Sequence, residues 1–174
     1  LEMGVEYAVD VTAVSRSGRR NTQTSPRFSV DWTPPNVGRV DDMYVGTDAE
    51  RDACAYCRDE IDYNTNASYL AIEWCCGWDD AESGLQSYSV AFGTSPDDMD
   101  IMPWLPVGLN DSFTLPNVVL ETGMSYYGCV VAVNNAGLFS EVVCSDGVIY
   151  DDTPPVMLEV NDGLQAGFDV DTQS

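Results

Sequence analysis

The chain has 174 residues, with 29 acidic side chains against 7 Lys and Arg, no histidine, and a formal net charge of −22. Nucleic acids and anionic membranes are therefore poor partners, because binding to phosphate needs a surplus of cations. The missing histidine excludes Ser-His and Cys-His nucleophile systems within the chain, and the six cysteines favour disulfides and an oxidising, extracellular compartment.

Residues 1–30 are expected to form the C-terminal hairpin of a domain. Apolar and polar residues alternate loosely over 3–14, which is the period of a strand. Residues 15–18 are turn formers, and 26–30 are predicted to be the returning strand. The segment 31–36 that follows is predicted to be a linker, since its two prolines fix the backbone and remove hydrogen-bond donors.

Residues 37–150 are expected to form one complete domain built from strands. The predicted strands span residues 40–45, 69–76, 85–92, 101–109, 112–115, 124–133 and 142–150. Short strands, turn residues at steady spacing and the lack of a helical period predict an all-β fold, an antiparallel seven-stranded Greek-key sandwich. An insertion at about 47–61 interrupts the pattern, and we interpret Cys54 and Cys57 as pinning it.

One pattern occurs twice, about 120 residues apart. The residues Leu1, Gly4, Tyr7, Val11, Ala13, Val14 and Gly18 reappear as Leu120, Gly123, Tyr126, Val130, Ala132, Val133 and Gly137. The linker is repeated too, with Asp31, Thr33, Pro34 and Pro35 matched by Asp151, Thr153, Pro154 and Pro155. A repeat of this length predicts tandem copies of one domain. Residues 151–155 are then a second linker, and 156–174 the start of a following repeat.

The complete copy resembles a fibronectin type III domain. The resemblance is carried by Trp74, Tyr88, Leu120, Gly123 and Tyr126, followed by Val130, Ala132, Asn134 and Gly137. It implies that Trp74, Tyr88 and Tyr126 are structural core residues, as is Tyr7 in the first copy. It also implies a tyrosine corner, in which the phenol bonds to nearby backbone. Such modules are generally adhesive or structural and supply no catalytic residues, so the chain is not expected to be an enzyme.

The cysteines are predicted to form disulfides. Cys129 and Cys144 are equally far from a hairpin centre between Ala136 and Gly137, and should face each other across adjacent strands. The remaining cysteines are Cys54, Cys57, Cys75 and Cys76. They are expected to form two bridges between the insertion and the second strand, and their crossing stays open. A four-thiolate zinc site is disfavoured because two adjacent cysteines reach one ion poorly, and redox catalysis is disfavoured because no βαβ pattern surrounds them.

Carboxylates cluster in the linkers and turns, and carboxylate oxygens are the ligands that calcium prefers. The candidate calcium ligands are Asp31, Asp41, Asp42, Asp79, Asp80, Glu82, Asp151, Asp152 and Asp162. The alternative is that aspartate is simply favoured in turns and caps and that these side chains form a solvated surface. A further acidic run at 97–100 is interpreted as a solvated turn. No cofactor other than calcium is expected.

Two short motifs predict attached glycans. Asn66 and Asn110 each begin an Asn-x-Ser pattern in a predicted loop, which makes both candidate N-glycosylation sites. Thr33 and Thr153 in the Thr-Pro-Pro linkers are weaker candidates for O-glycosylation.

We expect a non-catalytic structural protein, a tandem β-sandwich repeat of an extracellular filament, sheath or adhesive fibre. Copies would assemble head to tail, with strand complementation completing the partial domains at 1–30 and 156–174. The alternative is a secreted or cell-surface receptor or adhesion ectodomain, whose Trp32, Trp78 and Trp104 could stack on a glycan or contact a protein ligand. A third possibility is an accessory carbohydrate-binding domain of a secreted enzyme. No apolar run of membrane-spanning length occurs in the segment.

Overall fold

The computed structural model describes residues 1–45, 60–75 and 77–157, and these residues form strands and no helix. The strands of the N-terminal part are β1 (Glu6–Tyr7), β2 (Asp10–Val14), β3 (Arg20–Thr24) and β4 (Phe28–Ser29). The others are β5 (Arg39–Asp42), β6 (Tyr63–Asn64), β7 (Tyr69–Cys75), β8 (Leu85–Gly93), β9 (Met102–Gly108), β10 (Ser112–Pro116), β11 (Ser125–Asn134), β12 (Val143–Cys144) and β13 (Val148–Tyr150). Cys54, Cys57, Cys76 and Asp162 lie outside the described residues, as do most of the insertion and of the third repeat.

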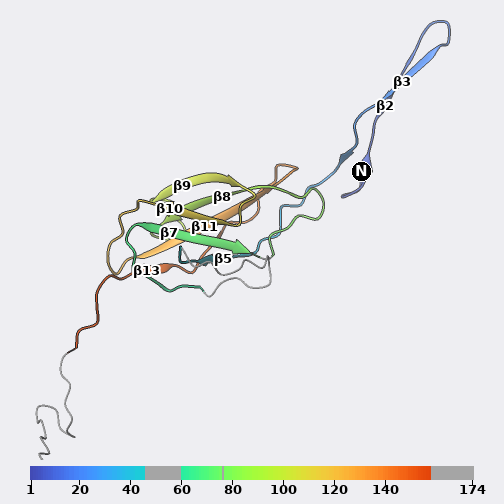
Figure 1. Ribbon diagram of the computed structural model, residues 1–174. Coiled ribbons are helices and arrows are strands. Elements are labelled where there is room, and N and C mark those ends of the chain that lie inside the picture. The colour runs from blue at the N-terminus through green and yellow to red at the C-terminus, as the bar shows by residue number, and fades with distance from the viewer. Residues whose placement is uncertain (46–59, 76, 158–174) are drawn as a thin grey trace, which may run out of the picture.

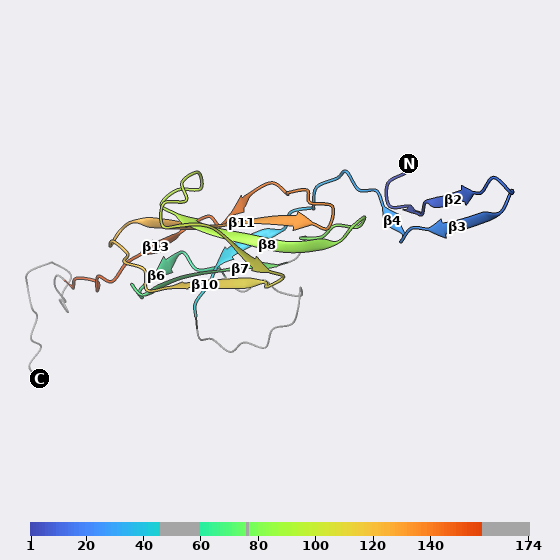
Figure 2. The same cartoon turned by 90° about the horizontal axis from the view of Figure 1, so that it is seen from above.

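Residues 37–150 fold into two sheets that lie face to face (Figure 2). One sheet has the order β10-β7-β5, and the other has the order β6-β13-β11-β8-β9, with β12 also paired to β11. Pairing is antiparallel throughout the described strands except between β6 and β13, which run parallel. The all-β sandwich predicted from the periodicity is therefore the observed architecture.

The strand count differs from the predicted seven, because nine strands occur between residues 37 and 150 of the described chain. The two-residue β6 was not predicted, and the predicted strand 142–150 is divided into β12 and β13. The division falls at Ser145, whose hydroxyl accepts a hydrogen bond from the Gly128 N–H at 3.2 Å. The Ser145 side chain thus accepts the hydrogen bond that a backbone carbonyl would accept in a continuous strand paired with β11.

The core lies between the sheets and follows the alternation of β7 and β8. Ile72 and Val90 are 0% exposed, and Trp74 is 2% exposed. The Trp74 and Tyr88 rings meet edge to face with centroids 5.6 Å apart. Such an aromatic pair adds roughly 0.5–1.5 kcal/mol to the burial of its surface. The two large rings that carry the resemblance are therefore packing residues.

The N-terminal hairpin projects from one end of the sandwich, and residues 151–157 leave from the other end (Figure 1). β2 pairs with β3, and β1 with β4. The return thus begins at Arg20 rather than at residue 26. Tyr7, predicted to be a core residue, is only half-buried and packs on Phe28 with ring centroids 6.1 Å apart. Strands equivalent to β7 and β8, which bury Tyr126, have no counterpart among the described residues of the first copy.

Candidate functional site

The central copy contains a tyrosine corner at the start of β11. The Tyr126 hydroxyl accepts a hydrogen bond from the Glu121 N–H at 2.7 Å. The Gly123 N–H donates to the Tyr150 carbonyl at 2.7 Å, and Gly123 has a φ of 82°, which a residue with a Cβ rarely adopts. Because Tyr150 is the last residue of β13, the corner holds the end of the domain just before the linker.

The same corner is built in the first copy. The Tyr7 hydroxyl accepts from the Glu2 N–H at 2.5 Å, and the Gly4 N–H donates to the Val30 carbonyl at 3.0 Å. Val30 directly precedes the first linker, as Tyr150 precedes the second. The repeated sequence motif therefore corresponds to a repeated hydrogen-bond pattern that fixes where each linker leaves its domain.

The two linkers also begin alike. The Asp31 carboxylate accepts from both the N–H and the hydroxyl of Thr33, at 2.9 and 3.1 Å. The Asp151 carboxylate accepts from the same groups of Thr153, at 2.9 and 2.5 Å. These hydrogen bonds hold the pKa of Asp151 below its usual value. Each aspartate closes a local turn before the two prolines, so the repeated Asp-x-Thr-Pro-Pro forms a defined bend rather than a free tether.

The first linker is attached to the sandwich through a buried amide. Asn134, the last residue of β11, is 0% exposed. Its Nδ2 donates to Asp31 Oδ2 at 2.8 Å, to Asp80 Oδ2 at 3.0 Å and to the Thr33 carbonyl at 3.0 Å. The Ser83 hydroxyl donates to the same Asp31 oxygen at 2.6 Å. Together with the bond between Asn36 Nδ2 and Asp79 Oδ1 at 2.8 Å, these contacts form what we call the joint.

The joint brings together several predicted calcium ligands. Carboxylate oxygens of Asp31, Asp80 and Glu82 all lie within 4.8 Å of one another. Burial alone would raise the pKa of Asp80. Hydrogen bonds from Asn134, Ser83 and Gly84 have the larger combined effect and leave this pKa below its usual value. The Asp80 carboxylate is therefore charged at neutral pH and already accepts several donors. Calcium at the joint stays a prediction, as it does for the exposed Asp152 in the second linker.

Asp41 and Asp42, also candidate calcium ligands, are not among the carboxylates that converge with Asp31. They are buried at the end of β5, at 1% and 2% exposed, and Asp42 faces Glu60 and Asp146 instead. Glu60 and Asp146 are not among the ligands predicted from the sequence. Asp146 lies in a Ser-Asp-Gly stretch of a kind found in many turns, and Glu60 lies at the end of the insertion, so no local pattern marks either residue as a ligand.

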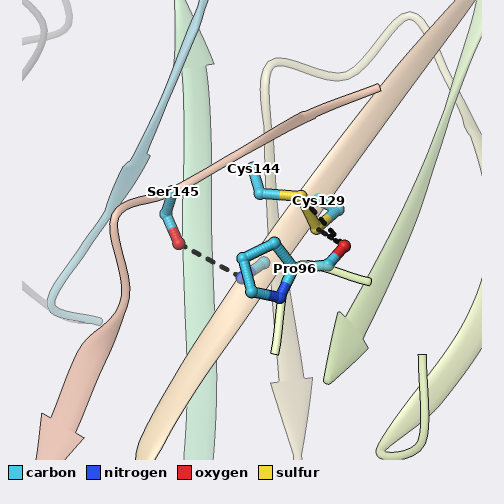
Figure 3. Close-up of a disulfide and its surroundings, with 5 residues drawn as sticks. Pro96, Cys129, Cys144 and Ser145 are labelled. Carbon is cyan, nitrogen blue, oxygen red and sulfur yellow. Dashed lines mark hydrogen bonds between the residues drawn. A yellow bond between two sulfur atoms is a disulfide. The ribbon is translucent and has the colours of Figure 1, made fainter. Parts of the chain in front are cut away.

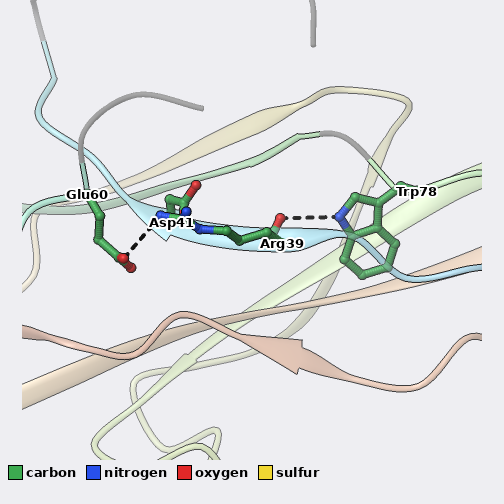
Figure 4. A network of polar contacts seen from close by, with 4 residues as sticks. All are labelled: Arg39, Asp41, Glu60 and Trp78. Atoms are coloured by element: carbon green, nitrogen blue, oxygen red, sulfur yellow. Dashed lines mark hydrogen bonds and ion pairs between the residues drawn. The ribbon is translucent and has the colours of Figure 1, made fainter. Parts of the chain in front are cut away.

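Arg39 lies beside this buried group. Its guanidinium pairs with Asp41 and, at 3.2 Å, with Glu60, while its carbonyl accepts from Trp78 Nε1 at 3.3 Å (Figure 4). Burial raises the pKa of Asp41 despite the ion pair. The pair raises the pKa of Arg39 further above its usual value. Arg39 therefore neutralises part of a strongly acidic region at the end of β5.

The predicted facing cysteines are bonded. Cys129 and Cys144 are register partners on β11 and β12, and a disulfide joins them (Figure 3). The Pro96 carbonyl oxygen lies 3.9 Å from Cys129 Sγ and 3.7 Å from Cys144 Sγ. A disulfide sulfur has no proton to donate, so these are packing contacts. Three of the other four cysteines lie outside the described residues; Cys75 ends β7.

The remaining predicted surface sites lie as follows. Asn66 and Asn110 are both exposed in loops, and Asn66 Oδ1 accepts from the Ser68 N–H at 2.9 Å. Trp32 is 58% exposed and Trp104 is 39% exposed. Trp78 is different. Its ring packs edge to face on Tyr88 with centroids 5.7 Å apart, so it belongs to the edge of the core. Thr33 is half-buried, whereas Thr153 is exposed.

Comparisons with known proteins bear on the fold. No protein-family model matches the chain, and no curated protein matches it. Domains A168–A170 of titin superpose with a TM-score of 0.54 at 18% identity, over 87% of this chain and 43% of that one. The chain has an immunoglobulin-like, fibronectin type III-like fold. The chicken CNTN1 FN1–FN3 domains give a TM-score of 0.42 at 16% identity, over 87% and 44%, and human cardiac titin module A71 gives 0.40 at 18%, over 68% and 92%.

The identity to these solved structures is low enough that the likeness concerns the fold alone. The chain spans less than half the length of the titin A168–A170 fragment. The described part of the chain contains no helix with the length and apolar character that crossing a bilayer requires. The fold alone does not assign a function to this β-sandwich, because function depends on the joint and the surfaces of the particular chain.

Proposed function

We propose that the chain is a non-catalytic structural module from a tandem array of β-sandwiches that forms an extracellular filament, sheath or adhesive fibre. One observation carries the proposal. The same tyrosine corner and the same Asp-Thr bend occur at both linkers, and the linkers leave from opposite ends of the sandwich (Figure 1). A unit that enters at one end and exits at the other, through identical bends, propagates in one direction.

The joint supports a stiff array. Asn134 and Ser83 bond from the sandwich to Asp31 in the linker, and the following two prolines limit the backbone further. Each hydrogen bond to a charged group contributes about 1.5–3 kcal/mol. Several such bonds acting together fix the direction in which one repeat follows another. A free ligand-binding module would need no such attachment.

The N-terminal hairpin has an uncovered apolar face, which supports head-to-tail assembly. Val11 is 66% exposed, whereas its counterpart Val130 is 0% exposed beneath the sheets. Val9, which strand alternation places on the same face, is also exposed, at 51%. Strands supplied by a second copy could cover this face by strand addition, and a heterologous contact of that kind does not close on itself.

An extracellular location is supported by the Cys129–Cys144 disulfide, because such bonds persist in oxidising compartments. The net charge of −22 supports solubility of an extended assembly through repulsion between neighbouring molecules. Glycans on the exposed Asn66 and Asn110 would act in the same direction.

Light scattering of the chain across a range of concentrations tests the assembly. We expect mass to rise with concentration, and Val11→Asp to abolish the rise. Thr12→Asp is the matched control, because it adds the same charge to the opposite face of β2. A chain that stays monomeric at all concentrations, or a Thr12→Asp variant that fails equally, would contradict self-association through this face.

The alternative is a receptor or adhesion ectodomain that binds a protein or glycan. The exposed rings of Trp32 and Trp104 favour it, since tryptophan is enriched in protein interfaces. Under this alternative, Trp104→Ala abolishes ligand binding in a glycan screen and leaves the mass of the particles unchanged.

A further inference from the structure

A second acidic group extends from the buried Asp42 to the exposed Asp146 and does not include the linker residue Asp31. It joins three separate stretches of chain, because Asp42 ends β5, Glu60 precedes β6, and Asp146 lies between β12 and β13. One carboxylate oxygen from each lies within 4.8 Å of the others. Because β5 belongs to one sheet and β12 and β13 to the other, the group bridges both layers of the fold.

Asp42 makes this group unlike an ordinary acidic surface. The residue is 2% exposed. The Ser145 side chain and the Gly147 backbone form hydrogen bonds with its carboxylate, but its Oδ2 is buried with no hydrogen-bond partner among the described residues. A buried carboxylate oxygen without a partner is strongly unfavourable unless a cation or a donor reaches it. Acidic side chains in solvated turns, such as those at 97–100, have no such requirement.

The described protein groups do not supply that cation. Arg39 forms ion pairs with Asp41 and Glu60, and neither Asp42 nor Asp146 takes part in an ion pair among the described residues. Four carboxylates therefore face one guanidinium. Burial raises the pKa of Asp42 to about 7, and burial together with Asp146 raises the pKa of Glu60. Keeping all four carboxylates charged in the folded state is therefore unfavourable unless a further cation is present.

We propose that Asp42, Glu60 and Asp146 bind a calcium ion between the two sheets. Carboxylate oxygens are the ligands that calcium prefers, and calcium accepts irregular geometry completed by water. Magnesium demands a near-ideal octahedron and releases its water reluctantly, which suits three ligands from separate segments poorly. The ion would offset the excess negative charge and tie β5 to the β12–β13 turn.

The test is thermal unfolding of the full chain in chelator and in millimolar CaCl2. We expect calcium to raise Tm by at least about 3 °C, and equal MgCl2 to raise it less. Asp42→Asn should abolish the calcium shift, and in chelator it should unfold at a higher temperature than the parent, because it removes a buried charge. Asp146 is exposed, so Asp146→Asn should leave the fold intact. This variant should also lose most of the calcium-induced rise in Tm.

Glu82→Gln separates this site from the joint, where Asp31, Asp80 and Glu82 converge. The variant should keep the full calcium shift. A parent protein whose Tm is unchanged by calcium would overturn the proposal. So would a calcium shift that survives in both Asp42→Asn and Asp146→Asn, or one that only Glu82→Gln removes, since the ion would then be bound elsewhere.

Discussion

Asn134 is the residue on which the joint depends most. It is fully buried and polar, and its amide reaches a linker that lies 101 positions or more away in sequence. Its Oδ1 also accepts from the N–H groups of Ala136 and Leu138, at 3.1 and 2.8 Å, which closes the turn after β11. One side chain therefore fixes a hairpin and a domain connection together.

Asn134→Ala is expected to lower the free energy of unfolding by about 1–3 kcal/mol, because it leaves buried acceptors without donors. The change should also increase the hydrogen exchange of linker residues 31–36, which mass spectrometry measures. Asn135→Ala serves as the control, since Asn135 is exposed and its side chain donates, among the described residues, to the carbonyls of Ser83 and Gly84. Equal effects of the two changes would contradict the assigned role.

The buried Asp42 and its acidic neighbours should give the free energy of unfolding an unusual dependence on pH. The folded pKa of Asp42 lies near 7, well above its unfolded value of about 3.9, so the folded state binds more protons in this window. In chelator, stability should therefore rise as pH falls from about 7 to 5. Glu60, Asp146, Asp41 and Arg39 face the same region, and Glu60 adds to the rise. Urea denaturation at several pH values measures it.

Asp42→Asn should flatten this rise, because the variant cannot take up the proton. Carboxylates whose pKa is lowered in the fold stabilise the protein throughout the range from pH 7 to 5. Their contribution to the free energy of unfolding is lost mainly below about pH 4. A parent protein whose stability falls steadily from pH 7 to 5 would show that Asp42 is not buried in its charged form.

The sequence predicted the structural positions of some residues and not of others. Trp74 and the pair Cys129 and Cys144 follow from strand alternation and from distance to one turn, which are local patterns. Asp42, Glu60 and Asp146 converge from three distant segments, and nothing in their neighbours marks that convergence. Only the fold brings them together.

At the scale of elements, β11 organises the sandwich. It pairs with β8, β12 and β13, and it carries the tyrosine corner at one end and Asn134 at the other. Midway, Gly128 allows the two sheets to approach, because a Cβ there would lie 2.3 Å from Ile72 Cγ2 and 3.1 Å from Phe92 Cε1.

Gly128→Ala is expected to lower the free energy of unfolding by about 1–3 kcal/mol, since the core must shift to admit one methyl group. Urea denaturation measures this loss. Gly128→Ala combined with Ile72→Val, which removes part of the crowding, should recover some of it. A single variant as stable as the parent would mean that the sheets are not in close contact at this position.

The disulfide between β11 and β12 closes a loop of 15 residues. Replacing both Cys129 and Cys144 by alanine should cost about 2–4 kcal/mol, mainly because the unfolded chain gains freedom. Comparing this double variant with the parent by urea denaturation under non-reducing conditions measures the cost. No difference would indicate that the bond does not form in the folded protein.

Element boundaries were predicted unevenly. The long strands β7, β8 and β11 follow from strict alternation, which hydrophobic packing on one face imposes. The break between β12 and β13 depends on the inward Ser145 hydroxyl, and β6 exists only because β13 lies beside it. Such tertiary causes leave no periodic trace in the sequence.

At the scale of the whole molecule, the chain enters the sandwich at one end and leaves it at the other (Figure 1). The duplicated motifs are visible in sequence alone, and in the described residues they correspond to a repeated tyrosine corner and a repeated Asp-Thr bend. The attachment of Asp31 to Asn134 and Ser83 was not predictable, since it depends on how the linker folds back onto the next domain. The sequence also did not reveal the uncovered hairpin face, because Val11 and Val130 occupy equivalent positions in the repeat and differ only in their exposure in the structure.

Negative-stain imaging of the native material tests the central claim most directly. If stiff joints connect successive sandwiches head to tail, the particles should be unbranched rows of globules with a constant spacing and a nearly constant direction. Isolated globular particles, or rows whose neighbouring globules point in random directions, would contradict the account.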